Sequence, residues 1–327
     1  MTPPDFFLVG APKAGTTALH AALAAHPQLY LSPVKEPKFY LCDGRRPPRG
    51  EHRGPGDAHS RNEWIWRRER YEALFATAPE GALRGESTPF YLSDPAALAR
   101  IRRDRPDARL VAVLRDPVDR AYSNWMHLWS DGLEPEPDVV RAVAAEDARR
   151  AAGWAPFWHY RRLGRYGEQV EALYRIFPRE QVHLLRYRDL VDDPAEAIGA
   201  VCTFLGVRAD DPPLPRPENT RPFAPDGRRT RRLARAARAG AWAGQWFPPQ
   251  AWRVAARPVL WALQNQDVPR PRLTPPQRAE LLTHFTDDIE LLGRVTGGDY
   301  SDWLRPAGRG AFADRQAPDL TATRATE

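Results

Sequence analysis

Short apolar runs alternate with longer amphipathic stretches along the first two thirds of the chain. Runs with the length of strands occur at 6–9, 29–31, 83–86 and 182–186. The run LVAVL at 110–114 is continuously apolar, which is typical of a strand buried on both faces. Helical periodicity occurs at 16–25, 64–75, 118–129, 165–177 and 194–205. This alternation predicts an α/β fold, in which a parallel sheet has helices on both faces.

The pattern changes after Gly206. Residues 208–239 are rich in Pro and Arg, and residues 240–263 hold four tryptophans, at 242, 246, 252 and 261. Residues 273–292 have the period of one amphipathic helix, and 306–327 have the composition of a disordered tail. We therefore expect a single domain over 1–305, with an irregular helical C-terminal third, and then a tail.

The charge of the chain opens the question of its ligand. The net charge is +6, and this suits an anionic ligand, nucleic acid or an anionic membrane surface. Cys42 and Cys202 lie far apart and outside any Cys/His cluster, so we expect neither a disulfide framework nor a metal site. The chain shows no signal-peptide pattern and no apolar run that could span a bilayer, so we expect a cytoplasmic protein without stable membrane insertion.

The sharpest local signal is the loop GAPKAGTT at 10–17, between the first strand and the first helix. Its two glycines let the backbone fold around an anion, and the N–H groups at the helix start point toward that anion. The spacing matches the Walker A loop GxxxxGK[ST], but Thr16 stands at the position of its lysine, and the lysine of this chain is Lys13. A turn of this kind can also exist without a ligand. We predict phosphate binding by Pro12, Lys13, Ala14, Gly15, Thr16 and Thr17.

Together with this loop, the segment LRDPVDRAYSNW at 114–125 resembles the sulfotransferase superfamily, whose members use 3′-phosphoadenosine 5′-phosphosulfate (PAPS). The resemblance implies that GAPKAGTT holds the 5′-phosphosulfate and that Arg115 and Ser123 hold the 3′-phosphate. Arg115 would give a forked, charge-assisted pair to phosphate, and Ser123 projects from the same side of the following helix. Alone, Arg115 is also explained by an ion pair with Asp116 or Asp119.

The resemblance extends to further segments in the expected order. GRYGEQV at 164–170 is similar to a family helix whose Tyr contacts the adenine, which implies this role for Tyr166; ordinary packing is the alternative. Residues 182–207 resemble a strand, turn and helix of the family scaffold, and the helix predicted at 273–292 resembles the closing helix of many bacterial members.

The arginine-rich stretch at 216–238 has several possible roles. The resemblance suggests that Gly227, Arg228 and Arg229 close over the 3′-phosphate, although such runs are usually solvated faces. Together with Trp242 and Trp246, the run also suggests a nucleic-acid surface or a peripheral membrane helix. Because the Trp segment is broken by prolines, we favour a wall of the acceptor pocket or core packing.

The segment VKEPKFY at 34–40 resembles the heparan-sulfate-type branch, in which the Glu is the catalytic base, and this implies Glu36. Another branch uses a His in a later segment, which here reads ESTPFY at 86–91 and has none. This chain departs from the heparan-type pattern at Ser87, where that branch typically has Lys.

The resemblance implies transfer of a sulfuryl group from PAPS to a hydroxyl or amine of a small-molecule, glycolipid or glycan acceptor by in-line displacement. Lys13 would stabilise the leaving phosphate and Glu36 would accept the proton. The product would be 3′-phosphoadenosine 5′-phosphate (PAP), without metal or nucleic acid, in bacterial secondary metabolism. The alternatives are a P-loop-type small-molecule kinase, a nucleotide-binding protein without turnover, and a basic binding module. Residues 43–62 are predicted as a surface loop and a candidate lid, and the acceptor and oligomeric state stay open.

Overall fold

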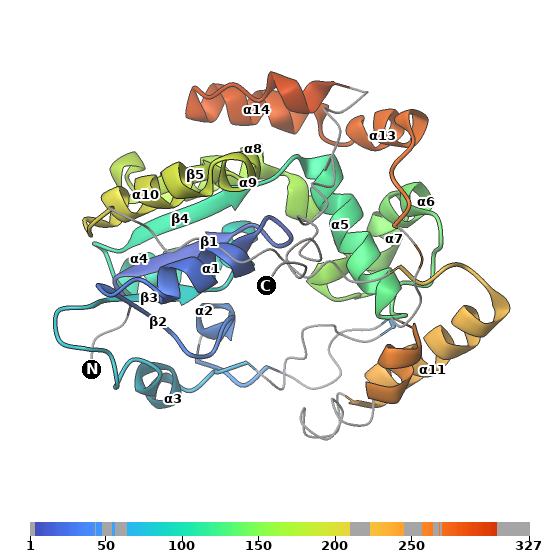
Figure 1. The fold of residues 1–327 in the computed structure, drawn as a ribbon, viewed down its shortest axis with the longest axis horizontal. Helices are drawn as coiled ribbons and strands as arrows, with labels where there is room; N and C mark the ends of the chain where they lie inside the picture. Colours follow the sequence, from blue (N-terminus) through green and yellow to red (C-terminus); the bar gives the residue numbers. More distant parts are fainter. Residues whose placement is uncertain are drawn as a thin grey trace, which may run out of the picture.

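The computed structural model describes residues 4–42, 44–47, 54–55, 64–209, 223–244, 257–263, 268 and 270–305. At its centre is a five-stranded parallel sheet in the order β2-β3-β1-β4-β5 (Figure 1). The strands are β1 (Phe6–Gly10), β2 (Leu29–Leu31), β3 (Leu83–Ser87), β4 (Arg109–Leu114) and β5 (Val182–Arg186). The predicted α/β fold is confirmed. The extent of the domain over 1–305 stays a prediction, and the predicted tail lies outside the described residues.

Helices cover both faces of the sheet. On one face α1 (Thr16–Ala24) packs on α10 (Pro194–Leu205), and on the other α4 (Pro95–Asp104) packs on α8 (Tyr166–Ile176). Right-handed crossovers between parallel strands produce this division. The remaining helices and 3₁₀ turns are α2 (Phe39–Cys42), α3 (Arg68–Ala73), η2 (Tyr91–Ser93), α5 (Pro117–Ser130), α6 (Val139–Ala144), α7 (Glu146–Ala151), η3 (Pro156–Trp158), η4 (Arg162–Gly164), η5 (Arg179–Gln181), α9 (Tyr187–Asp192), α11 (Arg228–Gly244), α13 (Pro275–Leu282), α14 (Thr286–Thr296) and η6 (Ser301–Leu304).

The strand order makes β1 the switch point of the sheet. After β1 the chain builds β2 and β3 on one side of it, and β4 then pairs with its other side. In open parallel sheets, ligands bind beyond the carboxyl ends of the strands at such a point. The loops that follow β1, β3 and β4 therefore meet at one edge. The predicted site residues Lys13 and Arg115 belong to these loops, and Ser87 ends β3.

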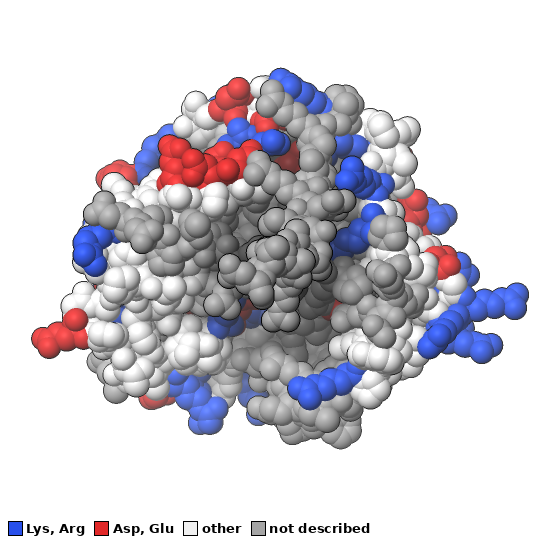
Figure 2. Space-filling model, viewed as in Figure 1, with Lys and Arg blue, Asp and Glu red and all other residues white. Residues whose placement is uncertain are grey.

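The C-terminal part differs from the expected pattern in two places. Residues 228–244, expected within an irregular stretch, form the continuous helix α11, which lies beyond α5 from the sheet (Figure 1). Arginine side chains project from the surface over α11, at the right of the view (Figure 2). The helix predicted over 64–75 is also shorter, since only α3 forms within it.

The single helix predicted over 273–292 is wrong, because the chain turns between α13 and α14. The turn lets the two halves reach different partners. Arg278 on α13 pairs with Asp116 and Asp119 at the start of α5. Phe285, fully buried in the turn, packs so closely on Gly164 that a Cβ there would lie 2.9 Å from its ring. One straight helix could not satisfy both contacts.

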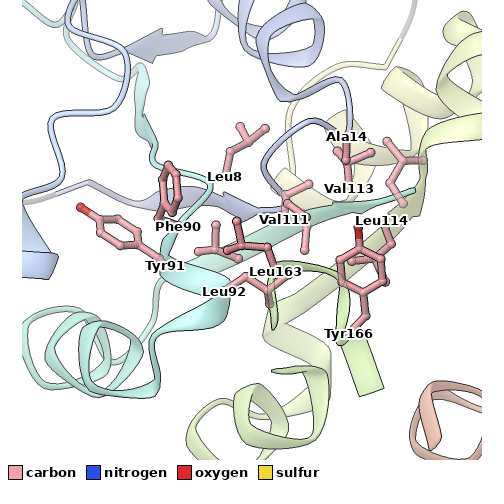
Figure 3. Packing of buried hydrophobic residues seen from close by; sticks show 14 of the residues in the cluster. Leu8, Ala14, Phe90, Tyr91, Leu92, Val111, Val113, Leu114, Leu163 and Tyr166 are labelled. Atoms are coloured by element: carbon pink, nitrogen blue, oxygen red, sulfur yellow. The ribbon is translucent and has the colours of Figure 1, made fainter. Parts of the chain in front are cut away.

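Apolar side chains from the strands and the surrounding helices form one core (Figure 3). Every residue of β1 is buried, and in β4 only Arg109 is exposed, which confirms a central strand at 110–114. Leu8, Val111, Leu92 and Leu163 all belong to this core (Figure 3). Burial of one such side chain contributes about 1.5–3 kcal/mol, so this core holds the strand ends and their loops in place.

Candidate active site

The loop between β1 and α1 presents a helix start to the carboxyl edge of the sheet. Gly15 takes the N-cap position in left-handed backbone, with φ 83°, and no side chain caps the helix. A Cβ at Gly15 would lie 2.8 Å from the Tyr187 ring, so only glycine fits this turn. The first N–H groups of α1 are thereby left to face an anion.

The residues predicted to bind phosphate differ in their exposure to solvent. Pro12, Ala14 and Thr16 are buried and shape the loop, whereas Lys13 is partly exposed and Thr17 is exposed. Lys13 also has left-handed backbone, with φ 67°. This conformation is uncommon for a residue with a side chain, and it directs the lysine away from the path of the helix.

Lys13 contacts a histidine that the sequence did not single out. Its Nζ lies 3.2 Å from Nδ1 of His127 on α5. Because an ammonium group can only donate, Nδ1 must accept, and a neutral ring then carries its proton on Nε2. That atom lies 3.5 Å from Asp131 Oδ2. His127 follows Ser123 by one helical turn, and this spacing was the signal that could have identified it.

Arg115 lies beside the same loop. Its Nη1 donates to the backbone oxygen of Lys13 at 3.1 Å, and its guanidinium stacks 4.7 Å from the centre of the Tyr187 ring. Asp116 and Asp119, the alternative partners predicted for Arg115, pair instead with Arg278. Arg278 therefore already provides both carboxylates with an ion-pair partner.

Asp116 has a structural role at the start of α5. Its Oδ1 accepts from the backbone of Val118 at 2.9 Å and of Asp119 at 3.2 Å, while Arg278 pairs with both carboxylates. Burial and the neighbouring charge of Asp119 raise the pKa of Asp116 to about 6. This arrangement fixes the helix that carries Ser123 and His127, and it ties α13 to the site.

Ser123 and Tyr166 come from α5 and α8. Ser123 is partly buried on α5, eight residues after Arg115. Tyr166 begins α8 and is only 1% exposed, with its hydroxyl pointing toward the end of β4 (Figure 3). Burial raises its pKa to about 12. The adenine contact predicted for Tyr166 stays a prediction, since the ring is packed in the core.

The segment with Glu36 is bound to the end of β3. The backbone N–H of Glu36 donates to Ser87 O at 2.9 Å, and that of Lys38 donates to Thr88 Oγ1 at 3.3 Å. Glu36 and Lys38 both have left-handed backbone, with φ 59° and 60°. Such a conformation costs about 1–3 kcal/mol for each residue, so these hydrogen bonds and the surrounding packing must hold it.

Two lysines flank the carboxylate of Glu36. Its Oε1 accepts from Lys35 Nζ at 2.8 Å, and its Oε2 lies 3.8 Å from Lys38 Nζ. Lys38 is only 4% exposed, and its ammonium lies 5.4 Å from the ring centres of both Trp64 and Phe90. The carboxylate of Glu36 is therefore oriented from both sides, although its side chain still has 18% of its surface exposed.

A buried carboxyl group is connected to this segment through Thr88. Glu86 is fully buried, accepts from Thr88 Oγ1 at 2.6 Å, and accepts from the Tyr71 hydroxyl. Burial raises the pKa of Glu86 to about 7, and these hydrogen bonds lower it by less. Thr88 thus connects Glu86 to the backbone of Lys38. In the sequence, the only signal for this buried carboxyl group was the run Glu-Ser-Thr-Pro at the end of a predicted strand.

His20 connects the phosphate loop to the segment with Glu36. It lies one turn after Thr16 on α1, and its Nδ1 is 2.8 Å from Ser87 Oγ. Burial and the charge of Lys35 lower its pKa to about 4, against an opposing effect of Glu36, so the ring is neutral near pH 7. Ser87, where the resembling branch typically has Lys, therefore binds a neutral imidazole.

Other predicted residues lie apart from this site or outside the described chain. Arg228 and Arg229 begin α11, where they are exposed. Most of the candidate lid at 43–62 lies outside the described residues, as do Trp246 and Trp252. Within the described part, no cluster of His, Cys, Asp and Glu has the form of a metal site, and no helix is long and apolar enough to cross a membrane.

Residues 4–211 match the model of the Sulfotransferase family. The chain belongs to the sulfotransferase family. It is 30% identical over 206 residues to heparan sulfate glucosamine 3-O-sulfotransferase 3A1 of Mus musculus, covering 63% of this chain and 46% of that protein. It is 28% identical over 212 residues to the mouse bifunctional heparan sulfate N-deacetylase/N-sulfotransferase 4, covering 62% and 22%. The chain spans about half the length, or less, of these curated relatives.

A solved structure extends the similarity over nearly the whole chain. The sulfotransferase from Alicyclobacillus acidocaldarius superposes with a TM-score of 0.71 at 29% identity, covering 93% of this chain and 100% of that chain. The family implies PAPS as co-substrate. The donor set of this sulfotransferase fits such a group, because Lys13, Arg115 and the uncapped start of α1 meet beside one loop.

Proposed function

We propose that this sulfotransferase moves a sulfuryl group from PAPS to a hydroxyl or amine of a glycan, glycolipid or small-molecule acceptor. The observation that carries the proposal is that groups suited to bind phosphate and a carboxylate suited to accept a proton lie at the same edge of the sheet. Cations and helix N–H groups of the β1–α1 loop lie on one side, and the oriented carboxylate of Glu36 lies on the other. PAPS supplies the activated sulfuryl group when it is bound.

Binding of the donor is assigned to the β1–α1 loop and α5. The N–H groups at the start of α1 and Lys13 would hold the 5′-phosphate, and Lys13 would stabilise the negative charge that develops there. Arg115 and Ser123 would hold the 3′-phosphate, since Arg115 contacts this loop and Ser123 lies on the helix whose His127 contacts Lys13. His127 accepts from the Lys13 ammonium and orients it, so we assign it a positioning role.

Glu36 is assigned as the base that accepts the proton of the acceptor group. Its carboxylate is partly exposed, and the contacts to Lys35 and Lys38 hold it in one orientation. A positioned base typically contributes about 10²–10⁴-fold to the rate. The choice between hydroxyl and amine, a cytoplasmic location and a role in secondary metabolism stay predictions.

The proposal is tested first by calorimetric titration with PAP and with ATP in EDTA. We expect PAP to bind without metal and far more tightly than ATP, and Arg115→Ala to weaken PAP binding about 100-fold because a buried phosphate partner is lost. Arg175→Ala removes an exposed arginine on α8 and should leave PAP binding unchanged. Active acceptors would then be sought by sulfuryl transfer, with Glu36→Gln as the inactive control.

Two results would contradict the proposal. If ATP bound as well as PAP and only with Mg²⁺, the chain would act as a P-loop-type kinase. If PAP bound but no acceptor were sulfated in a broad screen, the alternative of a nucleotide-binding protein without turnover would be favoured.

A further inference from the structure

Helix α11 presents an arginine-rich face to solvent. Its 17 residues include six arginines and no acidic residue. Arg228, Arg232 and Arg235 are exposed and spaced so that they lie along one stripe of the helix, and Trp242 continues the same stripe. In the part of the chain that the structure describes, none of these three arginines has an ion pair with a carboxylate. Cationic side chains project from the molecule over α11 (Figure 2).

The opposite face of α11 is attached to the protein. Thr230, Ala234 and Ala237 are buried, and Arg238 Nη1 donates to Gly132 O at 3.1 Å. Gly132, just after α5, lies so close to the helix that a Cβ would be 3.0 Å from Ala234 Cα. The helix is therefore fixed by one side, and among the residues that the structure describes its arginine stripe forms no ion pair.

A second exposed tryptophan lies on a helical segment next to α11. Leu263, in the helical residues 257–263, is fully buried, and one of its methyl groups would lie 2.8 Å from a Cβ at Gly132. The same glycine contacts α11, so the two helical segments are neighbours. Trp261 in this segment is 66% exposed and Trp242 on α11 is 57% exposed. Neither indole packs in the core, which corrects that expectation for Trp242.

We propose that this face, formed by Arg228, Arg232, Arg235 and Trp242, binds the surface of an anionic lipid bilayer. Arginine side chains pair with lipid phosphate while indole rings reside at the level of the headgroups, so both residue types on one face match the chemistry of a membrane interface. Duplex nucleic acid would engage the arginines too, but its stacked bases give no reason for a large indole to be exposed at the far end of the stripe. The contact is peripheral and needs no inserted helix.

The test uses the full chain and sedimentation with vesicles of phosphatidylcholine, either pure or with added phosphatidylglycerol. We expect binding only to the anionic vesicles. The variant with Arg228→Gln, Arg232→Gln and Arg235→Gln should bind on the order of 100-fold more weakly, because each arginine near such a surface contributes about fivefold. Trp242→Ser should weaken binding several-fold and leave its salt dependence unchanged, since the indole carries no charge.

A matched variant separates this face from overall charge. Arg103→Gln, Arg175→Gln and Arg294→Gln remove the same charge from exposed positions on other helices and should bind like the wild type. Circular dichroism and thermal unfolding establish that each variant is folded. No binding of the wild type to anionic vesicles, or an equal loss in both triple variants, would overturn the proposal. Binding of duplex DNA that depends on the same arginines but not on Trp242, without vesicle binding, would also overturn it in favour of nucleic acid.

Discussion

The two segments that meet at the candidate active site each place a lysine in left-handed backbone, but they use the lysine differently. Lys13, in the β1–α1 loop, is partly exposed, and its ammonium group lies next to Nδ1 of the His127 imidazole. Lys38, in the segment with Glu36, is almost fully buried between two aromatic rings and close to a carboxylate. Burial and partners, more than the motif, therefore separate a lysine available to a ligand from one that holds the structure.

The strongest test of this comparison is the exchange of each lysine for methionine. Lys13→Met should lower the rate of sulfuryl transfer about 10³-fold, or ~4 kcal/mol, because charge on the leaving phosphate loses its cation. Lys38→Met keeps the β1–α1 loop intact, so PAP affinity should stay within about twofold of the wild type. Single-turnover kinetics and PAP titration measure both effects. Equal loss of PAP binding in both variants would mean that the two lysines share one role.

The same comparison shows what could be predicted from the sequence. The β1–α1 loop was predictable because its signal is local: an apolar strand, two glycines and a helix start follow each other within a few residues. Glu36 was predicted only through family resemblance. Its supports, His20 and Thr88, depend on β3 pairing in parallel with β1 and β2, which brings distant segments together. The break between α13 and α14 was likewise invisible, because the contacts of Arg278 and Phe285 that cause it are tertiary.

The buried carboxyl group beneath the segment with Glu36 predicts a pH effect on stability. The pKa of Glu86 is about 7 in the folded chain and 4.5 ordinarily, so between these values the folded state holds more protons than the unfolded state. Stability should therefore fall as the pH rises through this range, by about 3 kcal/mol in total. Glu86→Gln should abolish this part of the pH dependence.

Urea unfolding across this pH range measures the effect. Glu180→Gln makes the same change at an exposed position in η5 and should leave the pH dependence as it is in the wild type. If the wild-type and Glu86→Gln profiles had the same slope, Glu86 would be ionised throughout. The hydrogen bonds that connect Glu86 to the segment with Glu36 would then involve a charged carboxylate rather than a neutral carboxyl group.

The smallest effect is expected from the link between this support and the segment above it. Thr88→Val keeps the shape of the side chain but removes the Oγ1 atom that accepts from Lys38 N and donates to Glu86. Because the left-handed backbone at 36–38 then loses one of its hydrogen bonds, Glu36 should be positioned less well. We expect kcat to fall about tenfold, or ~1.4 kcal/mol, with PAP affinity unchanged.

Thr88→Ser restores the hydroxyl and should restore most of the rate, whereas Thr203→Val removes an exposed hydroxyl on α10 and should have no effect. A loss of PAP affinity in Thr88→Val that matched the loss of kcat would show that the segment with Glu36 also shapes the donor site. The distinction between a locally specified donor loop and a base held by tertiary contacts would then fail. An unchanged kcat would instead show that packing around Lys38 alone holds this backbone, since the aromatic contacts at 5.4 Å remain in the variant.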